Sequence, residues 1–453
     1  MKFITITIFL LTSLTSFSQR KPYDLAIKNA KIFDVKTGKV VMNRTVLIKD
    51  GIIGDIVKRH RKILAIRTID ASEKLLTPSF IDTHIHPTDV FGDYNKAPKY
   101  LADDSLKIYR KMLTDSYLPF GVTTVLMLGQ PETWLKPILE WSNNPLPHQL
   151  DILTAGGALI SKEERPSYIG HTAVESPQDS KRKVEEYYKL GIRHIKLYWR
   201  LREPELKSAL KTADSLGMKC YGHIDQNVMT IDKTLDMGLK NYEHLVTLPF
   251  SILVTQDDLG KAYHQYEMNY GKVSSLIEQL QLFLEMFRYI DENKKVELTS
   301  LIAKLANQKA TFSSTINLLA ELFNPAKTNE ILSELEKNKN IRTEENFKIF
   351  MKYVKQMHER GIKIRIGTDM EKGGESLLSE QILLAKFGFS QESILQICTI
   401  NGASALGIDS IVGSIEKGKK ADLILWGKNP LVNYLNFNSD KTIIKDGVEL
   451  KTF

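Results

Sequence analysis

A short apolar run that ends in two histidines constrains this chain more than any other stretch. Residues 78–87 read PSFIDTHIHP. Residues i and i+2 of a β-strand point to the same face, so His84 and His86 converge on one point if this run is a strand. Two imidazoles held in this way suit a divalent metal such as zinc. Pro87 cannot extend a central strand. The run therefore predicts a strand that ends at a metal site.

Apolar strands and amphipathic helices alternate along the middle of the chain. Strands are expected over 75–86, 121–128, 151–158, 192–198, 218–224, 241–247, 310–317 and 362–368. Helices are expected over 181–191 and 205–217, and both end on glycine, a common C-cap. Eight such strands favour an α/β fold with a parallel (β/α)8 barrel. A doubly wound sheet is the alternative, but no GxGxxG motif follows a strand.

Polar residues occur where several of these strands end. In a β/α barrel the chemistry lies at the C-terminal ends of the strands. The polar residues expected there are His84, His86, Lys196, His223, His244 and Asp369. Any one of these histidines could be an ordinary hydrogen-bonded core residue. Six such residues at five strand ends are hard to explain by packing alone, because a buried charge is costly unless it is paired or bound to metal.

Short strands with turn signals also occupy both ends of the chain. Between residues 23 and 70, Lys49-Asp50-Gly51 indicates a tight hairpin turn. This segment is too short to bury both of its faces, so a partner is needed. Strand-like sequence at 421–426 and 442–447 can supply that partner.

Several of these motifs resemble one known family. The run PSFIDTHIH is similar to the first barrel strand of the amidohydrolase superfamily, and residues 413–423, GSIEKGKKADL, resemble a second signature of that family. Glu243-His244-Leu245 and Gly367-Thr368-Asp369 resemble its imidazolonepropionase-like and prolidase-like branch. The resemblance implies a TIM barrel over residues 71–410 and a small β-sandwich built from residues 19–70 and 411–453.

The same resemblance implies a centre with two divalent metal ions, with zinc expected. His84, His86 and Asp369 match the ligands of one ion, and His223 and His244 match those of the second. Lys196 matches a lysine that CO2 carboxylates in the family, which turns it into an anionic bridge; an unmodified ammonium has no lone pair for a metal. Asp369 would also take a proton from the bridging hydroxide as it attacks the substrate.

These features predict a hydrolase acting on amide-type C–N bonds of a dipeptide, an N-acyl amino acid or a cyclic amide. His171, Tyr198 and Arg200 are the expected substrate contacts; Tyr198 could hydrogen-bond an oxyanion and Arg200 could bind a carboxylate. The alternatives are a mononuclear deaminase, an esterase, lactonase or phosphotriesterase on the same centre, and a noncatalytic binding protein.

One interval, 249–307, is too long for a single crossover helix, and its apolar stretch 273–287 is expected to be helical. It is interpreted as a helical lid over the barrel mouth. The alternative is a packing or oligomer element on the barrel side, and a homo-oligomer fits that alternative.

The first 18 residues have the pattern of a secretory signal. Lys2 is followed by an apolar region over residues 3–14 and by a small-x-small site at residues 16–18. Export to the periplasm or medium is therefore expected, with no further stretch long enough to span a membrane. The net charge of +8 is spread out, and the basic run 58–62 is read as a solvated turn, so no nucleic-acid partner is expected.

Overall fold

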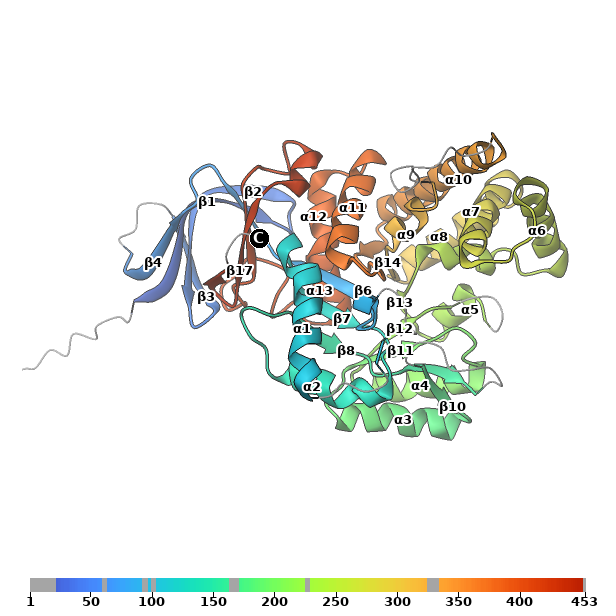
Figure 1. The fold of residues 1–453 in the computed structure, drawn as a ribbon, viewed down its shortest axis with the longest axis horizontal. Helices are drawn as coiled ribbons and strands as arrows, with labels where there is room; N and C mark the ends of the chain where they lie inside the picture. Colours follow the sequence, from blue (N-terminus) through green and yellow to red (C-terminus); the bar gives the residue numbers. More distant parts are fainter. Residues whose placement is uncertain are drawn as a thin grey trace, which may run out of the picture.

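The computed structural model describes residues 22–58, 63–91, 97–98, 103–162, 171–224, 229–323 and 334–450, and it mixes strands with helices (Figure 1). The predicted signal peptide and most of the basic run 58–62 lie outside these residues. The strands are β1 (Tyr23–Asp34), β2 (Lys39–Lys49), β3 (Ile52–Lys58), β4 (Ala65–Asp70), β5 (Leu75–Pro78), β6 (Phe80–Ile85), β7 (Val122–Met127), β8 (Asp151–Thr154), β9 (Ala158–Ser161), β10 (His171–Val174), β11 (His194–Leu197), β12 (Lys219–Gly222), β13 (Asn241–Tyr242), β14 (Thr311–Ser313), β15 (Lys363–Arg365), β16 (Leu423–Trp426), β17 (Lys441–Lys445) and β18 (Val448–Glu449). The helices are α1 (Asp103–Tyr117), α2 (Leu135–Asn143), α3 (Pro177–Lys189), α4 (Glu203–Ser215), α5 (Ile231–Asp236), α6 (Gln256–Tyr270), α7 (Leu276–Asn293), α8 (Lys295–Asn307), α9 (Ile316–Ala320), α10 (Glu334–Glu359), α11 (Gly373–Lys386), α12 (Gln391–Cys398) and α13 (Ile400–Leu406).

Two parallel sheets form the middle of the molecule. One has seven strands in the order β10-β9-β11-β12-β13-β14-β15, and the other has three in the order β6-β7-β8. The first strand meets the last, because the Thr83 amide donates to the Ile366 carbonyl at 2.9 Å and the Asp369 amide donates to the His84 carbonyl at 3.0 Å. This near-sequential parallel order, with helices between the strands, fits the predicted barrel.

The predicted strand 75–86 is two strands that belong to different sheets. β5 pairs with β1 and β16, whereas β6 pairs with β7. The change falls at Ser79: its amide donates to the Asp422 carbonyl at 3.0 Å, and the next amide, that of Phe80, donates to the Gly121 carbonyl at 2.8 Å. The sheet built from the chain ends thus continues to residue 78, past the expected start of the barrel at 71.

Other predicted strands are shorter than expected, most clearly those at 241–247 and 310–317, and one is divided. β13 stops at Tyr242 and β14 stops at Ser313. His244 and Thr315 lie beyond these ends and have positive φ angles of 56° and 48°, outside the φ range of regular strand residues. The predicted strand 151–158 is divided between β8 and β9. β13 and β14 thus end just before Glu243-His244 and Ser314-Thr315, whereas the break between β8 and β9 falls at Ala155-Gly156-Gly157.

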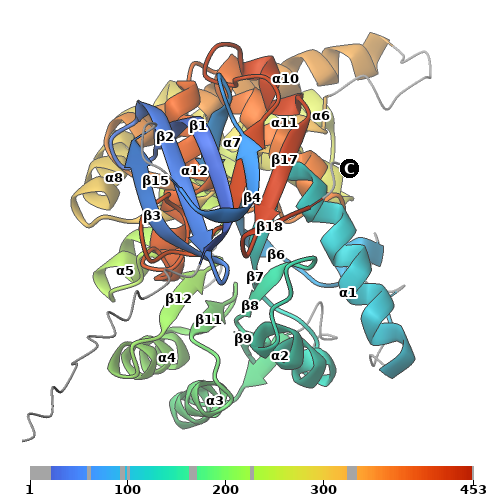
Figure 2. The ribbon, with the colours of Figure 1, turned by 90° about the vertical axis from the view of Figure 1, so that its left-hand side faces the viewer.

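Strands from both chain ends form one eight-stranded sheet, in the order β18-β17-β16-β5-β1-β2-β3 with β4 beside β1 (Figure 2). The predicted turn Lys49-Asp50-Gly51 joins β2 to β3, with φ of 52° at Asp50 and 76° at Gly51, as a hairpin turn requires. Alternate residues of β1 enter separate apolar clusters, Ile27 in one and Ala26 in another. Both faces of this sheet are therefore buried over β1.

A buried ionic cluster joins this sheet to β8. The Lys445 ammonium is fully buried and lies 2.8 Å from Asp151 and 2.9 Å from Asp446. Lys420 lies 2.8 Å from Asp446 and also pairs with Asp151. Paired charges of this kind tolerate burial, whereas a lone one does not. The junction of the two parts of the chain is therefore fixed in one register.

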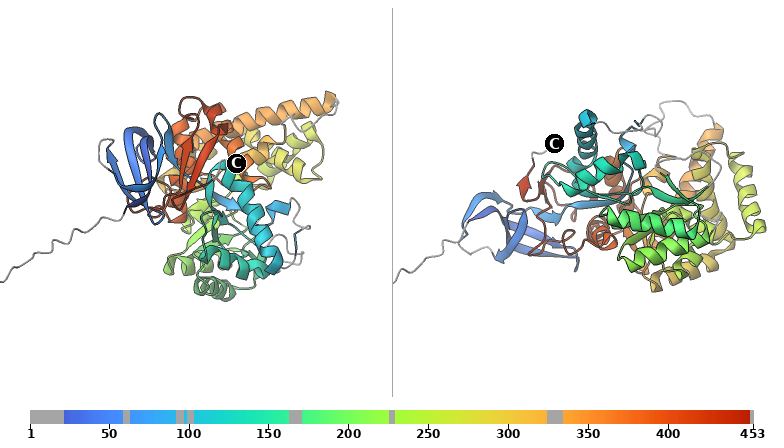
Figure 3. Two further views of the ribbon diagram at one scale, coloured as in Figure 1. Left: turned by 60° about the vertical axis from the view of Figure 1, so that its left-hand side comes forward. Right: turned by 90° about the horizontal axis from the view of Figure 1, so that it is seen from below.

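The interval 249–307 forms α6, α7 and α8, which lie at the end of the molecule opposite the eight-stranded sheet (Figure 3). A serine capping box starts α7 at Ser275. Farther along α7, the buried Glu285 carboxylate pairs with Arg342 and accepts a 2.6 Å hydrogen bond from Asn346, both on α10. These contacts hold α7 on α10, which favours the packing alternative over a lid. No helix in the described ranges is long and apolar enough to cross a membrane.

Candidate metal centre

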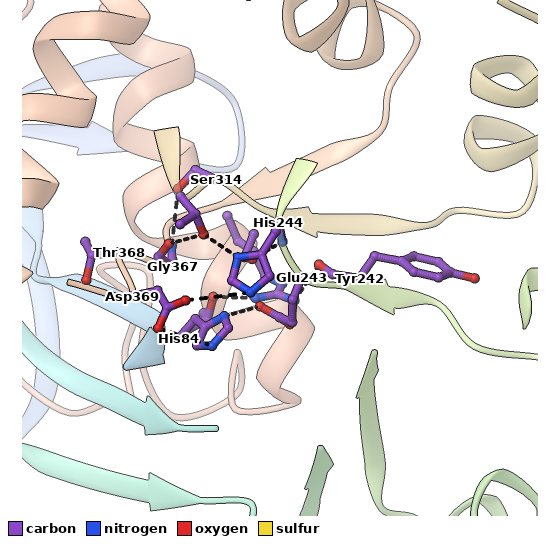
Figure 4. Close-up of polar contacts among 12 residues, drawn as sticks. His84, Tyr242, Glu243, His244, Ser314, Gly367, Thr368 and Asp369 are labelled. Atoms are coloured by element: carbon purple, nitrogen blue, oxygen red, sulfur yellow. Dashed lines mark hydrogen bonds and ion pairs between the residues drawn. The ribbon is translucent and has the colours of Figure 1, made fainter. Parts of the chain in front are cut away.

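The structure brings the six predicted ligands to one edge of the parallel sheets, where the strands end. They are His84 on β6 and His86 just after it, Lys196 on β11, His223 after β12, His244 after β13 and Asp369 after β15. Figure 4 shows His84, His244 and Asp369 pointing toward one another from three different strand ends. The carboxyl ends of parallel strands share an edge, so the alternation of strands and helices alone explains why these residues meet.

Asp369 lies at the centre of the cluster. Its Oδ1 is 3.3 Å from His86 Nε2 and 3.7 Å from His84 Nε2, and its Oδ2 is 3.7 Å from His244 Nε2. One ligand atom from each of His84, His86 and Asp369 lies within 4.8 Å of the others, close enough to share a metal ion. Asp369 has a φ of 50°, a strained value for this residue that is typical of functional sites.

Three of the imidazoles have their Nδ1 atoms engaged on the side away from Asp369. His84 Nδ1 lies 2.8 Å from Glu243 Oε2, His86 Nδ1 lies 2.9 Å from the Gly129 carbonyl, and His244 Nδ1 lies 3.1 Å from Thr315 Oγ1. A carboxylate or carbonyl accepts a proton from Nδ1, which leaves the Nε2 lone pair free. Metal ligands are commonly oriented in this way.

His223 and Lys196 complete the cluster. The ring of His223 lies 4.7 Å from that of His244, centroid to centroid. Lys196 is 1% exposed, and among the residues that the structure describes its Nζ atom has no hydrogen-bond partner. His84 Nε2 is likewise buried without one. Buried polar atoms without partners are costly, so these two atoms fit a bound group. The donor set, three or four imidazoles with a carboxylate, suits zinc or a similar divalent metal.

The protonation of the histidines also fits metal binding, which requires neutral imidazole. Burial, with the nearby Lys196, lowers the pKa of His84 to about 4, and burial with the nearby His84 lowers that of His244 to about 3. Burial also takes the pKa of His223 well below its ordinary value. Burial opposes a charge on His86 too, but its contact with Asp369 raises its pKa to about 9. A metal ion would take the place of the proton that His86 shares with Asp369.

Two of the three expected substrate contacts, Tyr198 and His171, lie in a row beside His223. The Tyr198 ring is 5.2 Å from the His223 ring and 4.5 Å from the His171 ring. The Arg200 guanidinium lies 4.1 Å from the centre of the Trp199 ring, and Arg200 takes a left-handed φ of 66°. Tyr198 therefore lies between the cluster and His171, whereas Arg200 is turned onto its own neighbour.

Sequence reasoning missed three buried charged residues behind the cluster. Asp82 accepts hydrogen bonds from Thr368 Oγ1 at 2.6 Å and from the His84 amide at 3.1 Å, so it ties β6 to the loop after β15. Burial raises its pKa to about 7. Glu243 and Arg365 form an ion pair at 2.5 Å, and both are fully buried. Asp82 and Glu243 stand in the motifs PSFIDTHIH and Glu243-His244-Leu245 but were given no role of their own, and the signal for Arg365 was a charged residue within the apolar residues 362–366.

Comparisons with known proteins agree with this geometry. A model described as the amidohydrolase family matches residues 271–449. The imidazolonepropionase of Clostridium tetani is 24% identical to the chain, over 94% of this chain and 98% of that protein. Two solved structures share the fold: a Xaa-Pro dipeptidase with bound methionine (19% identity, TM-score 0.63, 94% of this chain and 99% of that one) and the ochratoxinase of A. niger (15% identity, TM-score 0.63, 95% and 96%).

The chain resembles the amidohydrolase superfamily in sequence over residues 271–449 and in fold over most of its length. The family resemblance stated from the sequence, including the imidazolonepropionase-like and prolidase-like branch, is confirmed. The chain is a hydrolase that acts on carbon–nitrogen bonds. The amidohydrolase superfamily generally uses metal ions, and the cluster of His84, His86 and Asp369 could hold one.

A substitution at Gly367 tests how tightly the centre is packed. A Cβ atom at this position would lie 2.7 Å from Ser313 Cβ and 2.8 Å from His84 Cβ. Gly367→Ala should therefore push His84 aside and destabilise the protein by about 1–3 kcal/mol, the usual cost of overpacking. Urea unfolding measures this cost. The matched control is Gly260→Ala in α6, where a Cβ would meet nothing within 4 Å and should stabilise the helix by about 0.5–1 kcal/mol. Equal effects of the two substitutions would contradict the packing described.

Proposed function

We propose that this chain is a metal-dependent hydrolase that cleaves an amide-type C–N bond in a dipeptide, an N-acyl amino acid or a cyclic amide, with a dipeptidase activity expected first. The observation that carries the proposal is the buried Lys196 Nζ atom, which has no hydrogen-bond partner in the described part of the chain and lies beside three histidines, His84, His223 and His244, and Asp369. A mononuclear deaminase has no use for such a lysine. An esterase or phosphotriesterase on the same centre is the alternative that a substrate panel separates.

The proposed centre holds two divalent ions, with zinc expected. His84, His86 and Asp369 would hold one ion, His223 and His244 the second, and Lys196, carboxylated by CO2, would bridge them. When bound, such ions lower the pKa of a water molecule and polarise the substrate carbonyl. We also propose that the two parallel sheets close into a (β/α)8 barrel around this site. The strand order and the contacts of β6 with the loop after β15 support this barrel. The eight-stranded sheet is proposed to form the β-sandwich.

The residues of the chain supply proton transfer and orientation. Asp369 Oδ1 and Oδ2 face three imidazoles, so this carboxylate can accept the proton of the attacking water and pass it to the leaving nitrogen. Although burial opposes it, the neighbouring His84 and the hydrogen bond from His86 hold its pKa well below the ordinary value. Asp369 is therefore ionised at neutral pH, as a general base must be. The hydroxyl of Tyr198 is proposed to donate to the oxyanion.

Substitution of the ligands should separate metal binding from turnover. Lys196→Ala should lose metal and activity together, and acetate should restore part of both. His223→Ala should release chiefly one ion, and Asp369→Asn should lower kcat more than metal content, because it removes a proton acceptor. Elemental analysis and kinetics on a dipeptide and N-acyl amino-acid panel check these outcomes. If Lys196→Ala keeps two ions per chain and normal turnover, the two-metal proposal is wrong.

The pKa of Lys196 predicts how the centre assembles with pH. Burial lowers this pKa to about 8, although Glu243 and Asp369 oppose the shift. Only the neutral amine attacks CO2; the new N–C bond forms as the amine loses a proton, which gives the carbamate. Recovery of activity in metal-free protein given zinc at a fixed concentration of dissolved CO2 should thus rise with pH and level off above about 8. A recovery rate that falls between pH 6 and 8 would argue against carboxylation of Lys196.

We also propose that the protein is exported and cleaved after Ser18, on the sequence of residues 1–18. Mass spectrometry of the protein from its native cell should find an N-terminus at Gln19. An intact Met1 in the cytosolic fraction would exclude this proposal.

A further inference from the structure

The Glu243 carboxylate is fully buried and divides its two oxygens between two partners. Oε1 accepts from Arg365 Nη2 at 2.5 Å. Oε2 lies 2.8 Å from His84 Nδ1 (Figure 4). Glu243 and Arg365 are each 0% exposed. A carboxylate in this environment must use both oxygens as acceptors, because burial separates each of them from bulk solvent.

Arg365 is held from several sides, so its donors cannot turn away. Its Nη1 donates to Thr83 Oγ1 at 2.5 Å, and its Nη2 also donates to the Tyr242 carbonyl at 3.2 Å. The guanidinium carbon lies 5.4 Å from the centre of the Tyr221 ring. A guanidinium carries only donors. Arg365 therefore presents a fixed N–H to Glu243, and that N–H requires an acceptor.

We propose that Arg365 and Glu243 are positioning residues that fix the tautomer of His84, with the proton on Nδ1 and the lone pair of Nε2 directed at the metal. Arg365 contacts Glu243, Glu243 contacts His84, and His84 faces Asp369 in the cluster. This inference rests on the proposed function only in that His84 binds metal. Neither residue touches the substrate; each acts through the orientation of His84.

An amide in place of the carboxylate cannot serve both partners. Glutamine has one acceptor oxygen and one NH2 group. In Glu243→Gln, if the amide oxygen faces Arg365, the NH2 group faces His84 Nδ1 and forces the proton onto Nε2, which removes the metal lone pair. If the amide oxygen faces His84 instead, the amide NH2 group faces the N–H of Arg365, and neither of these two donors has an acceptor. The second conflict disappears when Arg365 is also replaced by an apolar residue.

The experiment compares the zinc dissociation constants of three full-length proteins, measured by competition with a chromophoric chelator: native, Glu243→Gln and Glu243→Gln/Arg365→Met. Glu243→Gln should bind zinc roughly 10- to 100-fold more weakly than the native protein, the usual effect of losing such a partner. The double variant should recover most of that loss, because the oxygen of the introduced amide is then free to accept from His84. A purely structural role predicts the opposite order, with the double variant the weaker binder.

Thr83→Val is a milder variant that decides the matter if Glu243→Gln does not fold. It removes the acceptor of Arg365 Nη1 and the hydrogen bond that Thr83 Oγ1 donates to the Ile366 carbonyl, while keeping the size of the side chain. Its matched control is Thr124→Val on β7, since the buried Thr124 hydroxyl has no hydrogen-bond partner in the described residues. Thr83→Val should weaken zinc binding relative to Thr124→Val, and 15N spectra of the metal-free proteins should show a larger share of His84 protonated on Nε2.

The outcomes separate this inference from the proposed function. If the native protein binds no zinc, the proposed metal centre is wrong. If the native protein binds zinc and Glu243→Gln binds it equally well, or the double variant binds no better than Glu243→Gln, the positioning role is wrong and the metal centre stands. Equal zinc affinities of Thr83→Val and Thr124→Val would also contradict the positioning role.

Discussion

Burial of charge is the constraint on which the rest of this structure depends. Lys196, Glu243 and Arg365 are all at most 1% exposed. A single buried charge is costly, but partners that satisfy each donor and acceptor offset that cost. Glu243 and Arg365 satisfy each other, whereas Lys196 Nζ finds no hydrogen-bond partner among the described residues. Glu243 and Arg365 therefore form a supporting ion pair, whereas Lys196 fits a bound ligand.

The same principle acts at the junction of the two parts of the chain. The backbone leaves one sheet and enters another between Ser79 and Phe80, on the N-terminal side of His84. Lys445 and Lys420 bind Asp151 at the start of β8, so the strands from the chain ends hold the parallel strand β8 at its N-terminal end. The GSIEKGKKADL signature acquires a physical role here, since it contains Lys420 and Asp422. The fixed junction places β6, and with it His84 and His86.

Much of the fold and the cluster could be predicted because both follow from simple geometry. The alternation of strands and helices and the rule that strand ends share an edge predicted which polar residues meet, and the glycine caps at Gly191 and Gly217 were predicted from the helix pattern. The left-handed backbone at His244 was not predictable, because tertiary contacts impose it against local preference. Arg365 was missed because an arginine in an apolar strand is read as an edge residue until its partner Glu243, 122 positions away, is known.

The central claim is that one buried lysine and five other strand-end residues hold two metal ions. The most direct measurement is a crystal structure of the native enzyme grown with zinc and bicarbonate, with anomalous data collected on both sides of the zinc absorption edge. We predict two anomalous peaks about 3.5–4 Å apart, one beside His84, His86 and Asp369 and one beside His223 and His244, joined by density that extends Lys196 Nζ into a carbamate. A single peak beside His84 and His86, with an unmodified Lys196 side chain, would contradict the claim.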